Sequence, residues 1–329
     1  MNPAAASPLV VVLNAGAGAG QGRTDEVSQV LQDGCAAAGR RLELLPVHEP
    51  HRLVAVARDA VARARDCGGI VVAAGGDGTV NTVAREALGC GCPFGVLPLG
   101  TFNYFSRTHG IPADPAAALQ VLLAGHRQPA QVGRVGDRIF LVNASLGLYP
   151  KLLEDREEWK RQLGRSRLVA FGAGLLTLLR DHRTLRLAVE SGGRERELRT
   201  PTLFVGNNAL QMEQLGFAEA RAIDAGLLAA IALRPVERLA LLGLLLRGAL
   251  GRLGEADDLL HIATPRLVVR ARRRLGLPGD PRIKVATDGE VGWMRLPLTF
   301  EVAPQTLDLL RPPAPAPERE AAAAGGAPA

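Results

Sequence analysis

Cysteine is scarce in this chain. Only four of its 329 residues are cysteines, and none of them has CxxC spacing. Four cysteines are too few for a disulfide scaffold, and the histidines are scattered without the spacing of zinc ligands. We therefore expect reduced thiols, as in a cytoplasmic protein, and no zinc centre.

Long apolar runs are also missing. The longest, residues 168–179, would span about 18 Å as a helix, short of the ~30 Å hydrocarbon core of a bilayer. No basic residue precedes the first apolar run at the N-terminus, so a signal peptide is not expected. The sequence predicts a cytoplasmic protein without a membrane-spanning helix.

Acidic residues are outnumbered, 33 to 39, by lysine and arginine, which gives a net charge of +6 at pH 7. A basic balance suits an anionic membrane surface or nucleic acid. Aromatic residues make up only 4% of the chain, and no motif that reads DNA or RNA is present. We therefore expect no nucleic-acid partner.

Residues 1–130 alternate strand patterns with helical ones. Strands are expected in PLVVVL, LELLPV, IVVAA and FGVLPL, each followed by a helical segment. This alternation predicts a doubly wound parallel sheet in an α/β nucleotide-binding domain. Glycine turns at 16–22, 75–78 and 100 all fall at the carboxyl ends of strands, where such sheets bind ligands.

Residues 131–311 instead show short strand patterns separated by turn residues, which predicts an antiparallel β-sandwich domain. Two helical inserts are expected at 151–181 and 236–252, with apolar, arginine-edged segments at 168–180 and 239–253. They are either buried helices or a surface that touches lipid. Residues 312–329, rich in proline, alanine and glycine, are expected to be a disordered tail.

The segment IVVAAGGDGTVNT, residues 70–82, is the most informative stretch of the chain. An apolar strand ends in a turn with three glycines and an aspartate, and a helical pattern follows. The turn is either a tight connection or a cradle for nucleotide phosphates, in which Thr79 caps the helix or binds a phosphate oxygen. Asp77 would then hold Mg²⁺ or orient the acceptor hydroxyl. The patterns of a P-loop and of a dinucleotide fold are absent.

Two further motifs can complete such a site. LPLGTFN, residues 97–103, is a second glycine turn, in which Thr101 and Asn103 are polar candidates. Asp288-Gly289-Glu290 is either a plain hairpin turn or a source of a general base, Glu290, for a hydroxyl nucleophile.

Six motifs in this order, GGDGTVNTVA, LPLGTFNYFSR, NASLGLYP, FVGNN, RAIDAGLL and ATDGEV, resemble those of the bacterial diacylglycerol kinase-like lipid kinases. That family is related to sphingosine kinases and more distantly to NAD kinases. The resemblance covers residues 8–310. It implies a nucleotide domain and a β-sandwich with the active site between them, where the γ-phosphate of ATP is transferred to a lipid hydroxyl with Mg²⁺.

The resemblance also implies site residues. Glu290 matches the proposed catalytic acid, with Asp77 as a second catalytic candidate, and His48 occupies a position where relatives often have a nucleotide-binding threonine. The expected ATP contacts are His48, Gly75, Gly76, Asp77, Gly78, Thr79, Val80, Asn81, Gly100, Thr101 and Asn103.

Three positions depart from the family's pattern. Tyr104, Gln131 and Ala225 each stand where relatives often have an aspartate. A regulatory Mg²⁺ in relatives uses the aspartate that Ala225 replaces together with backbone carbonyls. The matching ligands here would be Ala222, Asp224 and Leu227; either Asp224 substitutes for the missing carboxylate or the site is lost.

These observations lead to the hypothesis of a cytoplasmic, peripherally membrane-associated, ATP- and Mg²⁺-dependent kinase of a diacylglycerol-like lipid. Two alternatives stay open: a kinase of a soluble hydroxyl compound, similar to NAD kinase, and a non-catalytic nucleotide-binding regulator at the membrane. The sequence does not identify the lipid, and it leaves a homodimer open.

Overall fold

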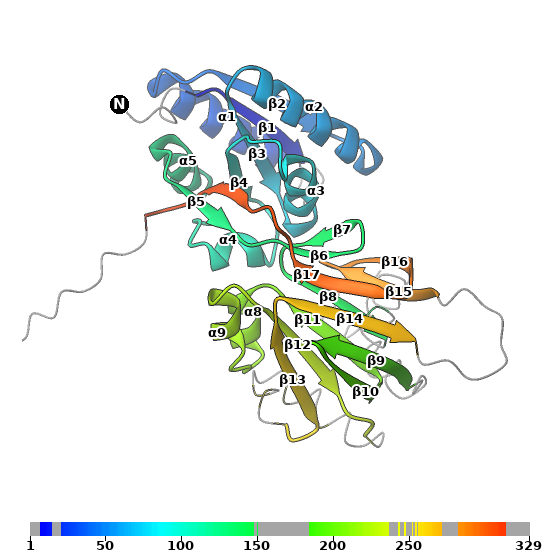
Figure 1. Cartoon of the computed structure of the whole chain (residues 1–329). Helices are drawn as coiled ribbons and strands as arrows, with labels where there is room; N and C mark the ends of the chain where they lie inside the picture. Colours follow the sequence, from blue (N-terminus) through cyan, green and yellow to red (C-terminus); the bar gives the residue numbers. More distant parts are fainter. Residues whose placement is uncertain are drawn as a thin grey trace, which may run out of the picture.

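The computed structural model describes residues 7–14, 21–147, 150, 184–236, 243, 247, 252, 254, 256–271 and 282–313. Figure 1 shows two halves, an α/β half and a β-rich half, joined by a small number of chain crossings. The expected combination of a parallel α/β domain with an antiparallel β-sandwich is confirmed. The expected helical inserts and tail fall almost entirely outside the described residues.

The α/β half is built on a six-stranded sheet in the order β2-β1-β3-β4-β18-β5. Strands β1 to β4 are parallel, and their apolar side chains form the first core. Because these strands are covered on both faces, they are nearly continuous apolar runs rather than alternating ones. The strands are β1 (Leu9–Asn14), β2 (Leu42–Val47), β3 (Ile70–Gly75), β4 (Phe94–Pro98), β5 (Arg127–Ala130) and β18 (Leu307–Leu310).

Helices cover both faces of this sheet. Helices α2 and α3 pack against each other over β1 and β3, while α1 and α5 pack together over β2 and β4. The one-turn 3-10 helix η2 (Pro50–Arg52) leads into α2. The helices are α1 (Gln21–Ala37), α2 (Leu53–Asp66), α3 (Asp77–Ala87), α4 (Tyr104–Thr108) and α5 (Pro115–Ala124).

The last strand of the described chain returns to the first sheet. Strand β18 lies between β4 and β5, parallel to the former and antiparallel to the latter. The sequence predicts this segment as part of the sandwich domain, and that prediction is wrong because a four-residue strand pattern does not indicate which sheet it joins. Its colour, near the red end of the scale, makes it visible among the strands of the upper half in Figure 1.

The second half is a sandwich of two six-stranded antiparallel sheets. One has the order β10-β9-β14-β17-β6-β7 and the other β13-β12-β11-β8-β15-β16, and a second core lies between them. Its strands are β6 (Gly133–Val135), β7 (Arg138–Phe140), β8 (Asn143–Gly147), β9 (Leu185–Ser191), β10 (Arg194–Thr200), β11 (Thr202–Gly206), β12 (Leu228–Leu233), β13 (Leu259–Thr264), β14 (Arg266–Ala271), β15 (Arg282–Thr287), β16 (Glu290–Arg295) and β17 (Leu298–Val302).

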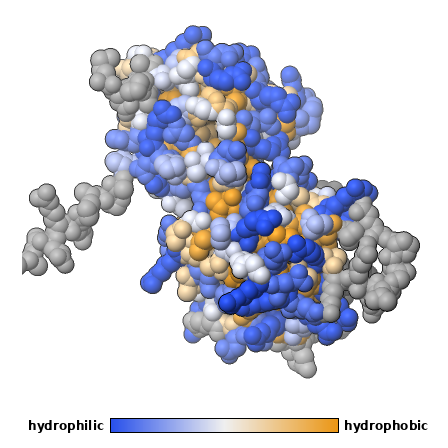
Figure 2. Space-filling view, in the orientation of Figure 1, coloured by the Kyte–Doolittle hydropathy of each residue, from blue (hydrophilic) through white to orange (hydrophobic). Residues whose placement is uncertain are grey.

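Two short helices, α8 (Ala209–Gln214) and α9 (Ala220–Asp224), pack on the outer face of the second of these sheets over a third, smaller core. In Figure 1 they lie on the side of the sandwich that faces α4. On the face of the molecule drawn in Figure 2, hydrophobic residues are visible where the two halves meet. The junction between the halves is therefore lined by elements of both.

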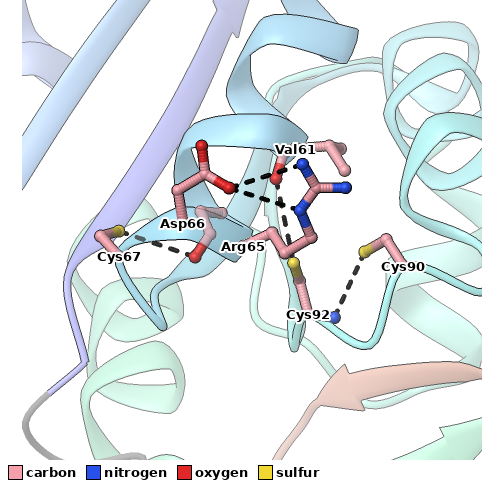
Figure 3. Close-up of polar contacts among 7 residues, drawn as sticks. Val61, Arg65, Asp66, Cys67, Cys90 and Cys92 are labelled. Atoms are coloured by element: carbon pink, nitrogen blue, oxygen red, sulfur yellow. Dashed lines mark hydrogen bonds and ion pairs between the residues drawn. The ribbon is translucent and has the colours of Figure 1, made fainter.

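All four cysteines, Cys35, Cys67, Cys90 and Cys92, are free. Figure 3 shows three of them near the end of α2, where Cys67 and Cys92 donate weakly to main-chain carbonyls and Cys90 accepts from the Cys92 N–H at 3.2 Å. Burial raises the pKa of the Cys92 thiol to about 12, so this thiol stays protonated. Among the described residues, no helix is both long and apolar enough to span a bilayer.

Candidate functional site

The two glycine turns pack directly against each other. They follow the neighbouring strands β3 and β4, and the Leu99 N–H donates to the Gly75 oxygen at 2.9 Å. A Cβ added at Gly100 would lie 2.6 Å from the Gly76 Cα, closer than side chains approach a backbone. The glycines are therefore needed for close packing of the two turns, which the structure brings together as the sequence predicted.

Helix α3 begins at the first turn. Its first intrahelical hydrogen bond runs from the Val80 N–H to the Gly76 oxygen at 3.0 Å, so the N–H groups of residues 77–79 precede the helical ladder. A Cβ added at Gly78 would meet nothing within 4 Å among the described residues, so no described side chain fills the space beside it. N–H groups that precede the helical ladder, together with the helix dipole, suit an anionic ligand.

Thr79 and Val80 are both buried. The Thr79 hydroxyl accepts a hydrogen bond from the Asn14 side chain at 2.8 Å, which ties the end of β1 to the helix start. The N-cap of α3 is Gly76, so the interpretation of Thr79 as the helix cap is wrong. Because the Val80 side chain lies in the core, this residue can meet a ligand only through its main chain.

Asp77 joins the first turn to the segment after the second one. Its carboxylate accepts from the Phe105 N–H at 3.3 Å, in the first turn of α4. Burial raises the pKa of Asp77, while the N–H groups of Phe105, Tyr104 and Asn103 oppose the shift. The side chain therefore braces the start of α4 and also supplies a carboxylate beside the open glycine turn.

The second turn is held by Asn103, which has a positive φ of 49°. Its side chain accepts from the Gly100 N–H at 3.0 Å and donates to the Gly100 oxygen at 2.9 Å, so its amide serves the turn itself. Thr101 is exposed. Phe102 is 51% exposed and stacks on Tyr104 with ring centroids 5.9 Å apart, an aromatic pair that was not among the residues predicted for the site.

Asp288 and Gly289 form the two-residue turn of the β15–β16 hairpin, both with positive φ, as Asp-Gly favours. The side chain of Asp288 has a second role. It accepts from the main-chain N–H groups of Leu141, Val142 and Asn143 at 2.7–2.9 Å, and from the Asn81 side chain at 2.6 Å.

These contacts place the hairpin against helix α3. Asn81 lies one helical turn beyond Gly78, so the bond to Asp288 brings the β-sandwich next to the glycine turn. Glu290, the first residue of β16, is exposed and lies two residues from this anchor. Burial raises the pKa of Asp288, and its four donors oppose that shift.

The FVGNN motif forms a second contact between the halves. Asn208 is buried and caps α8, and its oxygen also accepts from the Thr108 hydroxyl at 2.8 Å. Its amide donates to the Tyr104 oxygen at 3.3 Å. The sequence alone indicates no role for these residues, because their partners lie about a hundred positions earlier in the chain.

The remaining candidate residues do not belong to the two glycine turns or to the β15–β16 hairpin. His48 is exposed at the end of β2, an edge strand two positions from β3. Ala222, Asp224 and Leu227 lie together where α9 turns into β12, and the Ala222 oxygen accepts from the Leu227 N–H at 3.0 Å. In the described part of the chain, no group of three or more His, Cys, Asp or Glu side chains is arranged to hold a metal ion.

Two family models match the chain. The diacylglycerol kinase catalytic domain matches residues 8–135, and the YegS C-terminal NAD kinase beta sandwich-like domain matches residues 156–311. Both matches follow the architecture described above, one for each half.

Curated relatives of the chain are named as probable lipid kinases. A Klebsiella pneumoniae protein named "Probable lipid kinase YegS-like" is 39% identical over 98 residues, 29% of this chain and 33% of its own length. A protein of the same name from Pseudomonas aeruginosa PAO1 is 44% identical over 98 residues, 29% and 32% of the two chains. The matched segment thus spans about a third of the length of these relatives.

Solved structures share the fold over nearly the whole chain. A crystal structure described as a diacylglycerol kinase from Bacillus anthracis str. Sterne has a TM-score of 0.64 at 18% identity, covering 93% of this chain and 97% of its own. A second structure from the same strain reaches 0.69 at 21% identity, with coverage of 93% and 98%.

Proposed function

Because the chain belongs to the diacylglycerol kinase-like family of lipid kinases, we propose that it transfers the γ-phosphate of ATP to a hydroxyl of a diacylglycerol-like lipid. The observation that carries this proposal is the 2.6 Å hydrogen bond between Asn81 and Asp288. It joins the helix that begins at the glycine turn to the hairpin that presents Glu290. This bond supports the proposal because it brings the hairpin that carries the candidate base next to the helix that begins at the glycine turn.

The glycine turns would bind the nucleotide. The N–H groups of Asp77, Gly78 and Thr79 would donate to phosphate oxygens, and Gly78 leaves the approach open. Thr101 and Phe102, both exposed on the second turn, would form the adjoining wall, and the side chain of His48 lies further along the same edge. Asn81 and Asn103 act by positioning, because their side chains already bond to Asp288 and Gly100.

A single carboxylate at the turn, Asp77, fits a Mg²⁺ ion that arrives with the phosphates, since such an ion needs only one or two protein carboxylates. Bound there, Mg²⁺ would neutralise charge on the transferred phosphoryl group. The chain's own contribution is to hold Asp77 in place through the N–H groups that begin α4.

Glu290 would accept the proton of the lipid hydroxyl as that oxygen attacks phosphorus. Its side chain is exposed, so an acceptor can reach it, and Asp288 fixes the backbone from which it projects. Proton transfer to a positioned carboxylate contributes roughly 10²–10⁴-fold to a rate. The remaining acceleration would come from alignment of the two substrates.

The test is a labelling assay. The full chain is given ATP labelled at the γ-phosphate, Mg²⁺ and phospholipid vesicles containing a diacylglycerol, with NAD in solution as the competing soluble acceptor. We expect label in the lipid and none in NAD. Label in NAD without vesicles would support a soluble acceptor, and ATP binding without label in any acceptor would support a non-catalytic regulator.

Glu290→Gln should lower lipid labelling by about 10²–10⁴-fold without changing the unfolding temperature. Glu26→Gln, an exposed carboxylate on α1, is the matched control and should keep full activity. Undiminished labelling by Glu290→Gln would refute the assignment of the base while leaving the kinase activity intact.

A further inference from the structure

Gln131 links three segments at the junction between the two halves. It directly follows β5, and its side-chain nitrogen donates to the Asn207 side-chain oxygen at 2.8 Å and to the Leu227 main-chain oxygen at 3.2 Å. Asn207 belongs to the turn after β11, and Leu227 to the turn between α9 and β12. One carboxamide therefore ties together the start of the sandwich and two of its later turns.

The orientation of Asn207 shows what this position requires. Its side-chain nitrogen faces three main-chain oxygens, those of Gln131, Phe140 and Leu141, at 3.3–3.4 Å. All three are acceptors, so the nitrogen must point to them and the Asn207 oxygen must point to Gln131. Asn207 is only 6% exposed, so its oxygen needs a partner from the protein.

Two oxygens, from Asn207 and Leu227, thus converge on one point that must hold a hydrogen-bond donor or a cation. In the kinases that this chain resembles, a regulatory Mg²⁺ binds close to the carbonyl that corresponds to Leu227. Here the nitrogen of Gln131 occupies the point, at distances typical of an N–H donor. Mg²⁺ instead requires oxygen ligands at about 2.0–2.1 Å in an octahedral arrangement.

The other expected ligands do not restore a cation site. Ala225 carries no carboxylate, and the Asp224 side chain is exposed at the end of α9. The Ala222 oxygen accepts the Leu227 N–H at 3.0 Å, in a helix end closed by Gly226 with its positive φ of 81°. The residues present do not fit a second Mg²⁺.

We infer that the carboxamide of Gln131 replaces the regulatory cation and holds the junction together without metal. A neutral amide supplies N–H donors to both oxygens, so neither is left unsatisfied when no metal is bound. The junction of this chain is then constitutively closed, independent of the concentration of free divalent cations. This inference does not depend on which hydroxyl compound is phosphorylated.

The test measures thermal unfolding of the nucleotide-free full chain in EDTA and in excess Mg²⁺. The unfolding temperature of the unchanged protein should be the same in both. Gln131→Asp places a carboxylate opposite two oxygens, so it should unfold several degrees lower in EDTA and recover in Mg²⁺, because a bound cation stabilises by mass action. Terbium luminescence, titrated in parallel, should report a site in Gln131→Asp that the unchanged protein lacks.

Gln131→Met is the matched control, because methionine keeps the length of the side chain and removes its donors. It should unfold at a lower temperature in both solutions alike. The inference is overturned if Mg²⁺ raises the unfolding temperature of the unchanged protein but not that of Gln131→Met. It is also overturned if Gln131→Asp gains neither terbium binding nor stabilisation by Mg²⁺.

Discussion

The glycine turns and the Asp288–Glu290 hairpin form adjoining sides of the candidate site, but they are held by different forces. The turns pack closely because Gly76 and Gly100 have no side chains, so that their backbones can touch. The hairpin is held by one carboxylate, Asp288, which accepts four hydrogen bonds from three main-chain groups and one side chain.

The turns are specified by residues close together in the sequence, whereas the position of the hairpin depends on residues far apart. The turns lie about twenty-five residues apart on neighbouring strands, and each can be recognised from its own glycines. Asp288 and Asn81 lie 207 residues apart, and nothing in either segment identifies the other. Substitutions in the turns should therefore disturb packing by their volume, and substitutions in the hairpin should leave polar groups unsatisfied.

The largest effect is expected for Asp288→Ala. Three N–H groups would lose their acceptor at the junction, and the Asn81 amide would keep only the Ile139 main-chain oxygen at 3.5 Å, which should lower the free energy of unfolding by about 3 kcal/mol or more. Urea unfolding measures this change. Asp137→Ala, in the exposed turn of the β6–β7 hairpin, is the control and should change stability by less than about 0.5 kcal/mol. Equal unfolding midpoints for the two variants would show that the hydrogen bonds of Asp288 do not stabilise the junction.

A smaller loss is expected for Gly100→Ala. The added methyl would lie 2.6 Å from the Gly76 Cα and 2.8 Å from the Asn103 side-chain oxygen, so the two turns must separate. Overpacking of this kind costs about 1–3 kcal/mol. Urea unfolding and ATP binding by calorimetry should both show the effect. If stability falls and ATP binds as before, the contact between the turns is structural only.

The smallest effect on stability is expected for Gly78→Ala. Its methyl meets no described atom within 4 Å, and alanine favours the helix that glycine weakens, so stability should stay equal or rise by up to about 1 kcal/mol. Because the methyl enters the open space beside the helix start, ATP should bind roughly tenfold more weakly, a loss of about 1.4 kcal/mol. Unchanged affinity would place the phosphates elsewhere.

Several elements could be predicted from the sequence because their signals are local. The β3–turn–α3 unit and the Asp288-Gly289 turn both follow from short patterns of apolar residues, glycine and aspartate. The interpretation of Thr79 as a cap failed because the hydroxyl instead meets Asn14, at the end of another strand. The position of β18 in the first sheet was not predicted, because its partner strands β4 and β5 lie far from it in the sequence.

By itself, the sequence determined the two kinds of sheet, the glycine turns at strand ends and the order of motifs that identifies the family. Periodicity and backbone freedom at glycine are properties of neighbouring residues, and motif order is a property of the sequence itself. All three can therefore be recognised without the folded structure. The tertiary structure alone decided what each polar side chain bonds to: Asp288 with Asn81, Asn208 with Thr108, and Gln131 with Asn207 and Leu227. A hydrogen bond depends on two groups meeting at about 3 Å, and only the folded chain brings together groups so far apart in sequence.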